Sequence, residues 1–233
     1  MNRTKFYDAL RKSDLFGGAL SSQQVAGTEG ILDAFATHGD GRAKTLAYAL
    51  ATAYYETAYR MAPVRETLAD DDASARQRLK DAPYAQPEPP HGHAYYGRGP
   101  VQLTWKRNYA RSSSDAGVDL VRYPDKALDP EIGARILVRG LLDGRWNPDG
   151  KGIAHYLPDM GPDDLKNARR TVNLLDRWAL IAGFYQEFLS AIEQAGGVPQ
   201  ARPVDPEPQP ARQGDGLFAV VRSFINRLFG RAG

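Results

Sequence analysis

Two glutamates, Glu56 and Glu66, lie ten positions apart in the stretch AYALATAYYETAYRMAPVRE. The residues before Glu56 recur at helical spacing, which predicts a helix from about Gly41 to Tyr59. Its apolar side is made of Leu46, Ala49, Leu50, Ala53 and Thr57. Glu56 is expected at the edge of this stripe, where burial on one side raises the pKa of a carboxyl group. A carboxyl group with a raised pKa can donate a proton as a general acid.

The second glutamate falls on an irregular segment. Pro63 is expected to end the helix, because proline disfavours helical geometry in the residue before it and has no amide hydrogen. Glu66 then follows on the chain that leaves the helix. Two glutamates at this spacing also fit an ordinary solvated surface, since exposed glutamates are common. The pair alone is therefore compatible both with catalysis and with two solvated glutamates on the surface.

A second stretch, Tyr95–Tyr109, reads YYGRGPVQLTWKRNY and predicts a β-hairpin with one polar face. Val101 and Leu103 alternate with Gln102 and Thr104, so the two pairs should lie on opposite faces. Amide and hydroxyl groups beside an indole suit a sugar, which needs hydrogen bonds and an apolar platform. The same pattern also fits a structural hairpin with a polar outer side.

Taken together, YETAYRMAPVRE and YYGRGPVQLTWKRNY resemble glycoside hydrolase family 19, in particular the small chitinase-like endolysins of bacteriophages. A third matching stretch is NARRTVN, residues Asn167–Asn173, and the resemblance covers about residues 2–195. It implies that Glu56 is the general acid, that Glu66 is the base and that Thr104 helps to hold the attacking water. The substrate-binding residues that it implies are Tyr96, Arg98, Gln102, Trp105, Asn108 and Asn173.

This chain departs from the family pattern close to the first glutamate. Tyr55 stands where the family usually has histidine, and Ala58 and Tyr59 stand where glycines often follow. Neither difference removes an acid. The position of the second carboxylate, Glu66, varies more among relatives than that of the first.

The rest of the chain predicts a mostly helical fold. Further helices are expected at Lys5–Arg11, from Ser21 to Gly39, from Asp129 to Gly144, from Asp163 toward Arg170, and at Asp176–Ala195. The resemblance implies a lysozyme-like α+β fold, in which two helical lobes surround a cleft and one small β-hairpin is present. The run Asp70–Asp72 is expected to be a solvated turn or a helix start.

Composition excludes several classes of function. The net charge of +2 argues against a nucleic-acid-binding protein, and the absence of cysteine excludes disulfides and thiolate metal sites. His91 and His93 have no carboxylate or cysteine partner at helical ligand spacing, so we expect no metal site. We expect no cofactor, because two carboxylates and a water molecule can supply the chemistry of hydrolysis.

The end of the chain differs in composition. We predict a catalytic domain at 1–196, a proline-rich linker at 197–214 and a basic amphipathic helix at 215–233. The helical segment Leu217–Arg231 has one apolar face, and its only charges are arginines, which suits a membrane surface. A helix that docks on the catalytic domain, or on another copy of the chain, is the alternative.

The expected function is that of an endolysin that hydrolyses the glycan strands of bacterial peptidoglycan by general acid–base catalysis. Two carboxyl groups about 6.5–9.5 Å apart on either side of the bond would cleave it with inversion. A chitinase acting on N-acetylglucosamine polymers and a catalytically degenerate glycan-binding protein are the alternatives. The start of the sequence has no apolar signal-peptide core. We therefore expect that the protein is made in the host cytoplasm and acts on the cell wall after release. We also expect a monomer.

Overall fold

The structure, a computed structural model, describes residues 1–201. The predicted tail at 215–233 and most of the predicted linker lie outside the described residues. The α-helices are α1 (Arg3–Lys12), α2 (Ser22–His38), α3 (Ala43–Glu56), α4 (Asp72–Arg78), α5 (Lys106–Ala116), α6 (Pro130–Asp143), α7 (Ile153–Tyr156), α8 (Leu165–Ala168), α9 (Arg170–Asn173) and α10 (Trp178–Gln194). Short 3₁₀ helices are η1 (Glu66–Leu68), η2 (Pro83–Ala85) and η3 (Pro124–Leu128), and the strands are β1 (Val64–Arg65) and β2 (Arg98–Gly99).

The sequence signals for the ends of α2 and α6 are confirmed. Ser21 and Gln24 form a reciprocal capping box at the start of α2, in which each side chain accepts from the backbone of the other residue. The Asp129 side chain accepts hydrogen bonds from the first amides of α6, Pro130 occupies its first turn, and Gly144 ends it in a left-handed conformation. These local bonds fix where the helices begin and end.

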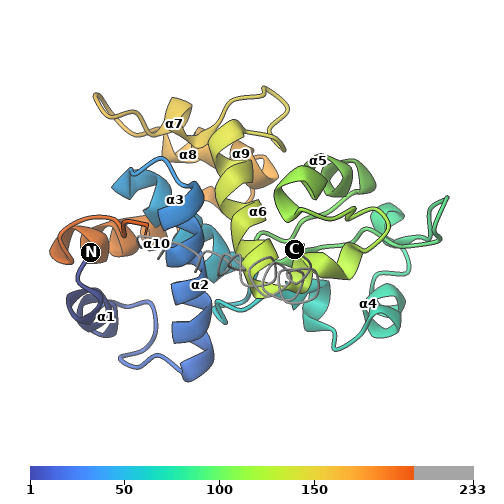
Figure 1. Cartoon of the computed structure of the whole chain (residues 1–233), viewed down its shortest axis with the longest axis horizontal. Coiled ribbons are helices and arrows are strands. Elements are labelled where there is room, and N and C mark those ends of the chain that lie inside the picture. The colour runs from blue at the N-terminus through green and yellow to red at the C-terminus, as the bar shows by residue number, and fades with distance from the viewer. Residues whose placement is uncertain (202–233) are drawn as a thin grey trace, which may run out of the picture. The chain divides into compact units, whose positions relative to one another are not determined.

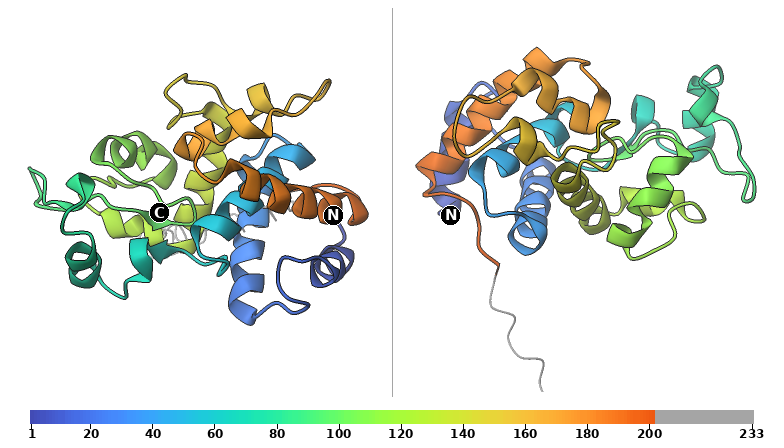
Figure 2. Two further views of the ribbon diagram at one scale, coloured as in Figure 1. Left: turned by 180° about the vertical axis from the view of Figure 1, so that it is seen from behind. Right: turned by 90° about the horizontal axis from the view of Figure 1, so that it is seen from above.

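Helix α3 lies at the centre of the larger part of the fold. It packs against α10, α6 and α2, and its residues from 45 to 54 are all buried. Figure 1 shows α1, α2, α3 and α10 gathered at one end of the described residues and α4 and α5 at the other, with α6 between them. The view from behind in Figure 2 shows the same arrangement. None of the helices among residues 1–201 is long and apolar enough to cross a membrane.

Helix α3 ends at Glu56, three residues before the predicted end at Tyr59. Ala58, Tyr59 and Met61 have positive φ angles of 48°, 68° and 59°, so the chain has left helical geometry before it reaches Pro63. Thr57 supports this exit, because its hydroxyl donates to the carbonyl oxygen of Ala53 and accepts from the amide of Met61. The candidate acid therefore lies at the C-terminal end of a rigid helix.

The small β element is present, but its main pairing is not the predicted hairpin. β1 pairs antiparallel with β2, with Val64 opposite Gly99 and Arg65 opposite Arg98. Within the predicted hairpin only one bridge forms, between Arg98 and Leu103. Pro100 has no amide hydrogen to donate, and Gln102 has a φ of 51°, so the segment between the bridge residues turns instead of extending. The alternation still holds in burial, since Val101 and Leu103 are buried whereas Gln102 and Thr104 are half-buried.

Buried apolar side chains form two separate clusters. The larger one joins α1, α2, α3, α5, α6 and α10. The smaller one lies under α4 and consists of Ala69, Ala75, Ala85, Ala94 and Tyr96. Four of these five residues are alanines, which bury little apolar area each. The mostly helical fold with two lobes and one small β element is thus confirmed, and the two lobes differ in how much apolar core they contain.

Candidate active site

The two glutamates line one cleft with a volume of about 600 Å³. Seven of the predicted site residues line this cleft: Glu56, Glu66, Gln102, Thr104, Trp105, Asn108 and Asn173. A second hollow of about 370 Å³ adjoins it and shares Glu56 and Gln102 in its lining. The first glutamate comes from the end of α3, the second from η1, and the rest from segments near α5 and α9.

Glu56 is a buried carboxyl group in an environment that favours its protonated form. Its side chain is 12% exposed, and one oxygen, Oε1, accepts a hydrogen bond of 2.6 Å from Nη2 of the fully buried Arg169. Burial raises the pKa of Glu56, and the Arg169 guanidinium opposes this rise without cancelling it. The position at the C-terminal end of α3 also disfavours a negative charge. Because Arg169 occupies Oε1, Oε2 is the oxygen suited to carry the proton that a general acid donates.

The Glu66 side chain is held in place by a hydrogen bond to each of its oxygens. Tyr84 donates its hydroxyl hydrogen to Oε1 at 2.8 Å, and the amide of Gly97 donates to Oε2 at 2.8 Å. The backbone amide of Glu66 in turn donates to the carbonyl oxygen of Gly97 at 2.7 Å. Burial and the bond to Glu66 raise the pKa of Tyr84 to about 12, so its phenol keeps the proton that it donates. A fixed, hydrogen-bonded carboxylate can accept a proton from water.

A side chain at position 97 would crowd both the Gln102 side chain and the Glu66 carboxylate. A Cβ atom there would lie 2.6 Å from Oε1 of Gln102 and 3.2 Å from Oε2 of Glu66. The first distance is shorter than real contacts allow, so the Gln102 side chain would have to move. The glycine in the sequence motif therefore reflects packing around the second acid.

Three polar side chains near Glu66 are oriented by bonds to backbone carbonyl groups. Gln102 donates to the carbonyl oxygens of Val64 and Gly99, at 3.0 Å each. Thr104 donates its hydroxyl hydrogen to the Gln102 carbonyl oxygen at 2.8 Å, and Asn108 donates to the Thr104 carbonyl oxygen at 2.8 Å. With these donors occupied, the side-chain oxygens of Thr104 and Asn108 can accept hydrogen bonds in the cleft.

Trp105 supplies an aromatic surface at the cleft. Its side chain is 40% exposed, and it packs edge-on against Tyr84 with ring centroids 5.3 Å apart. Trp105, Gln102 and Leu174 all line the cleft with positive φ angles, which are strained conformations for residues other than glycine. Such strain is concentrated at functional sites because the surrounding structure must hold it.

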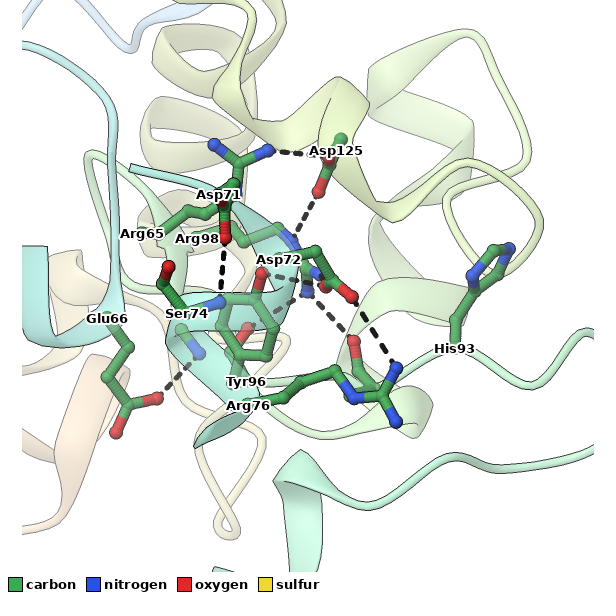
Figure 3. A network of polar contacts seen from close by, with 12 residues as sticks. Arg65, Glu66, Asp71, Asp72, Ser74, Arg76, His93, Tyr96, Arg98 and Asp125 are labelled. Carbon is green, nitrogen blue, oxygen red and sulfur yellow. Dashed lines mark hydrogen bonds and ion pairs between the residues drawn. The ribbon is translucent and has the colours of Figure 1, made fainter. Parts of the chain in front are cut away.

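Two predicted substrate-binding residues are in the wrong place for that role. Tyr96 is 0% and Arg98 1% exposed, so neither side chain can contact a ligand in the cleft. The Arg98 guanidinium lies 3.7 Å from the centroid of the Tyr96 ring and is bound to the carboxylates of Asp72 and Asp125 (Figure 3). The motif predicted that Arg98 binds substrate, because the sequence alone does not show that the carboxylates of Asp72 and Asp125 bind its guanidinium group. The prediction that Tyr96 and Arg98 contact substrate is therefore wrong, and both side chains have an internal role.

Sequence reasoning missed three residues that shape the site. Arg169 lies inside the NARRTVN motif, whose paired arginines were a signal that was not used. Tyr84 comes from the proline-rich segment before the second motif, where nothing in the pattern marked it. Arg107 lines the cleft and lies 5.5 Å from the centroid of the Trp105 ring. Within residues 1–201, no group of three or more histidine, aspartate or glutamate side chains could hold a metal ion.

Comparison with known proteins identifies the class of this site. Residues 23–137 match the profile of the family described as chitinase class I, glycoside hydrolase family 19. The match includes Glu56, Glu66 and the Gly97–Asn108 segment, and it supports a glycoside hydrolase family 19 domain in this part of the chain. The resemblance found in the motifs is thereby confirmed at the level of the family.

Among curated proteins, the chain is similar to plant chitinases. It is 33% identical to Endochitinase 1 of Theobroma cacao over 96 residues, which are 34% of this chain and 30% of that protein. It is 50% identical to Endochitinase A2 of Pisum sativum over 85 residues, or 30% of this chain and 26% of that protein. It is also 32% identical to Inactive chitinase-like protein 1 of Hevea brasiliensis over 89 residues, or 30% of this chain and 28% of that protein. The chain thus spans less than a third of the length of these relatives.

Among solved structures, the chain is similar to a bacterial family 19 chitinase, described as revealing differences with plant enzymes. The match has a TM-score of 0.48 and 22% sequence identity, and it covers 85% of this chain and 96% of that chain. Chitinase C from Streptomyces griseus HUT6037 matches with a TM-score of 0.44 and 17% identity, over 85% of this chain and 78% of that chain.

Proposed function

We propose that this protein is an endolysin that hydrolyses glycosidic bonds in the glycan strands of bacterial peptidoglycan. The observation that carries the enzymatic part is the pair of carboxyl groups in one cleft, one buried with a raised pKa and one held by two hydrogen bonds. General acid–base hydrolysis needs this division between a proton donor and a proton acceptor. Since one relative is described as inactive, similarity alone would not establish activity.

In the proposed reaction, Glu56 protonates the oxygen of the leaving sugar as the glycosidic bond breaks. Glu66 accepts a proton from a water molecule, and the oxygen of that water forms the new bond to the anomeric carbon. The Thr104 oxygen, whose hydrogen is bound to Gln102, accepts the second hydrogen of the water. The product has inverted configuration, which requires the carboxyl groups to be about 6.5–9.5 Å apart. Trp105 and Asn108 bind the sugar beside the cleaved bond, and Asn173 lines the same cleft.

One cation of the cleft, Arg107, supports peptidoglycan rather than chitin as the substrate. Glu56 is paired with Arg169, and Arg170 is paired with Asp149 at 3.1 Å. Arg107 lines the cleft and, among residues 1–201, has no carboxylate within ion-pair distance. The stem peptides of peptidoglycan carry carboxylates, whereas chitin is neutral. A cation at the edge of the cleft can therefore attract the first polymer and gains nothing from the second.

A chitinase is the second candidate, because the curated relatives described above are endochitinases. Release of reducing ends from purified peptidoglycan and from chitin oligomers separates the candidates. We expect muropeptide products from peptidoglycan, whereas products from chitin alone would make the protein a chitinase. Products from neither polymer would contradict hydrolysis and favour the glycan-binding alternative.

A substitution at Arg107 tests the basis of the preference. Arg107→Gln should raise KM for peptidoglycan about two- to fivefold, the range for losing an exposed ion pair of up to about 1 kcal/mol. It should leave KM for chitin oligomers unchanged. Arg11→Gln on α1 removes an exposed arginine away from the cleft and is the control. An equal change with both polymers would show that Arg107 does not recognise the charge of the substrate.

The lytic role is also a proposal, and the motif resemblance supports it. We expect purified protein to clear suspensions of Gram-negative cells only after their outer membrane has been permeabilised. Glu56→Gln is the matched control for effects that do not depend on catalysis. Equal clearing by the variant would mean that lysis does not come from bond hydrolysis.

A further inference from the structure

Arg98 is a buried charge that the proposed reaction does not use directly. Its side chain is 1% exposed, and an arginine remains charged in proteins, so the fold must supply partners for it. These partners are the carboxylates of Asp72 at 2.9 Å and Asp125 at 2.7 Å, the carbonyl oxygens of Ala94 at 2.9 Å and Tyr96 at 3.4 Å, and the Tyr109 hydroxyl at 3.0 Å. Figure 3 shows Asp72, Tyr96 and Asp125 around the Arg98 guanidinium group.

Asp125 connects Arg98 to the other strand of the small sheet. Its Oδ1 accepts from Nε of Arg98 at 2.7 Å, and its Oδ2 accepts from Nη2 of Arg65 at 2.6 Å. Arg65 and Arg98 lie directly opposite each other in the β1–β2 pair. One carboxylate from η3 therefore bridges two arginines that belong to two strands.

The bridge is immediately next to the second catalytic candidate. Glu66 directly follows Arg65, and Gly97 directly precedes Arg98. Glu66 and Gly97 exchange two hydrogen bonds, one through the Glu66 backbone amide and one through its carboxylate. The Arg65–Arg98 pair and the Glu66–Gly97 pair are thus consecutive pairs along the contact between these two chain segments.

This element has few other sources of stability. Each strand is two residues long, and an isolated pair of short strands is marginal in water. The nearby apolar cluster is built mainly from alanines. Burial of large apolar side chains, which fixes α3 in the other lobe, is not available to the same extent here. Within residues 1–201, two sets of side-chain contacts join β1 to β2: the ionic bridge through Asp125, and the Gln102 amide, which donates to Val64 and Gly99.

We propose that Asp125 is a positioning residue for Glu66, acting through Arg65 and Arg98. This inference rests on the proposed function in so far as Glu66 is the catalytic base. Asp125 touches neither the substrate nor the reacting atoms. It fixes the register of β1 on β2, and this register places the Gly97 amide where it binds the Glu66 carboxylate. A displacement of about 1 Å at a catalytic group can reduce the rate about 100-fold.

Asp125→Asn is the variant that tests this role. Asp125 is 52% exposed, so the substitution buries no new polar group, whereas removing Arg98 could unfold the lobe. The matched control is Glu29→Gln. Glu29 also accepts from two donors, Arg3 and Tyr7, but it joins α1 to α2, away from the cleft. Both variants keep the shape of the side chain and remove one negative charge.

Two readouts are measured on the wild type and both variants, below their melting temperatures. The first is amide hydrogen exchange at Glu66 and Gly97, and the second is kcat and KM on peptidoglycan. For Asp125→Asn we expect exchange at both amides to accelerate about tenfold or more, and kcat to fall about tenfold or more with KM within about twofold of wild type. Glu29→Gln should leave both readouts as in wild type, even if its Tm falls equally.

Each outcome decides the proposal. The proposal is overturned if amide exchange and kcat in Asp125→Asn are the same as in Glu29→Gln. It is also overturned if the loss of kcat follows the loss of Tm in both variants. If wild type hydrolyses neither peptidoglycan nor chitin, the proposed function fails. Exchange at Glu66 and Gly97 then still shows whether Asp125 holds this pair in place.

Discussion

The two lobes hold their carboxyl groups by different physical means. Glu56 ends a helix whose residues from 45 to 54 are all buried, and it lies against the large apolar cluster beside a buried arginine. Glu66 lies on a short irregular segment, in a lobe with a small alanine-rich cluster, and polar contacts hold it in place. Apolar packing positions the first group, and hydrogen bonds and ion pairs position the second.

This difference matches the two chemical tasks. A proton donor must stay protonated near neutral pH, and burial raises the pKa of Glu56 in that direction. A proton acceptor must be held in a fixed orientation toward the water, and the two hydrogen bonds to Glu66 hold its carboxylate in place. One cleft can therefore contain an acid and a base of the same residue type.

The largest expected effect comes from removing the acid. Glu56→Gln keeps the shape of the side chain but cannot donate a proton, so kcat on peptidoglycan should fall about 10²- to 10⁴-fold. Circular dichroism should show an unchanged helix content. Glu193→Gln, at an exposed position on α10, is the control and should retain wild-type turnover. Turnover of Glu56→Gln within a few fold of wild type would remove Glu56 from the mechanism.

A smaller effect is expected from the arginine behind the acid. Arg169 lowers the pKa of Glu56 against the effect of burial, so Arg169→Gln should let that pKa rise further. Glu56 then keeps its proton to higher pH, so the alkaline limb of the kcat/KM profile should shift to higher pH. Loss of a hydrogen bond to a charged group, worth about 1.5–3 kcal/mol, should also lower kcat roughly 10- to 100-fold.

Arg169→Lys provides the comparison for this prediction. Lysine keeps the positive charge but loses the planar fork that reaches both Glu56 and the Asp176 carbonyl oxygen. Its alkaline limb should lie between those of wild type and Arg169→Gln. A shift of the alkaline limb to lower pH in Arg169→Gln would show that the arginine does not stabilise the ionised acid.

The smallest effect is expected at Tyr84, on the side of the base. Tyr84→Phe removes one of two hydrogen bonds to the Glu66 carboxylate, and the Gly97 amide still binds the other oxygen. Because a typical hydrogen bond contributes about 1 kcal/mol, kcat should fall about fivefold, with KM nearly unchanged. Steady-state kinetics on peptidoglycan measure this. A loss as large as that of Glu56→Gln would give Tyr84 a direct part in proton transfer.

Local signals in the sequence predicted much of the fold. The capping box at Ser21 and the aspartate and proline at the start of α6 act through neighbouring residues. The apolar spacing of α3 can likewise be recognised without knowing which helices pack against it. The cleft residues Gln102, Thr104, Trp105 and Asn108 were found because one short motif contains them all. What these signals share is that each pattern is contained in one short stretch of sequence.

Contacts between distant segments could not be predicted in the same way. Arg98 was expected to contact substrate, but Asp72 and Asp125, which lie 26 and 27 residues away from it, cover it. Arg169 meets Glu56 across 113 residues. The partner of the small strand was predicted within the hairpin, whereas the structure pairs it with the segment before Glu66. Hydrophobic periodicity carries no information on which charged groups meet in the fold.

The pH dependence of kcat/KM for wild type and Glu66→Gln on peptidoglycan tests the division of tasks most directly. We expect the wild-type profile to fall at high pH as Glu56, whose pKa burial raises, loses its proton. Glu66→Gln should be much slower and keep this fall at high pH, because Glu56 is still the acid. Loss of the fall at high pH in Glu66→Gln would contradict the assignment of acid and base.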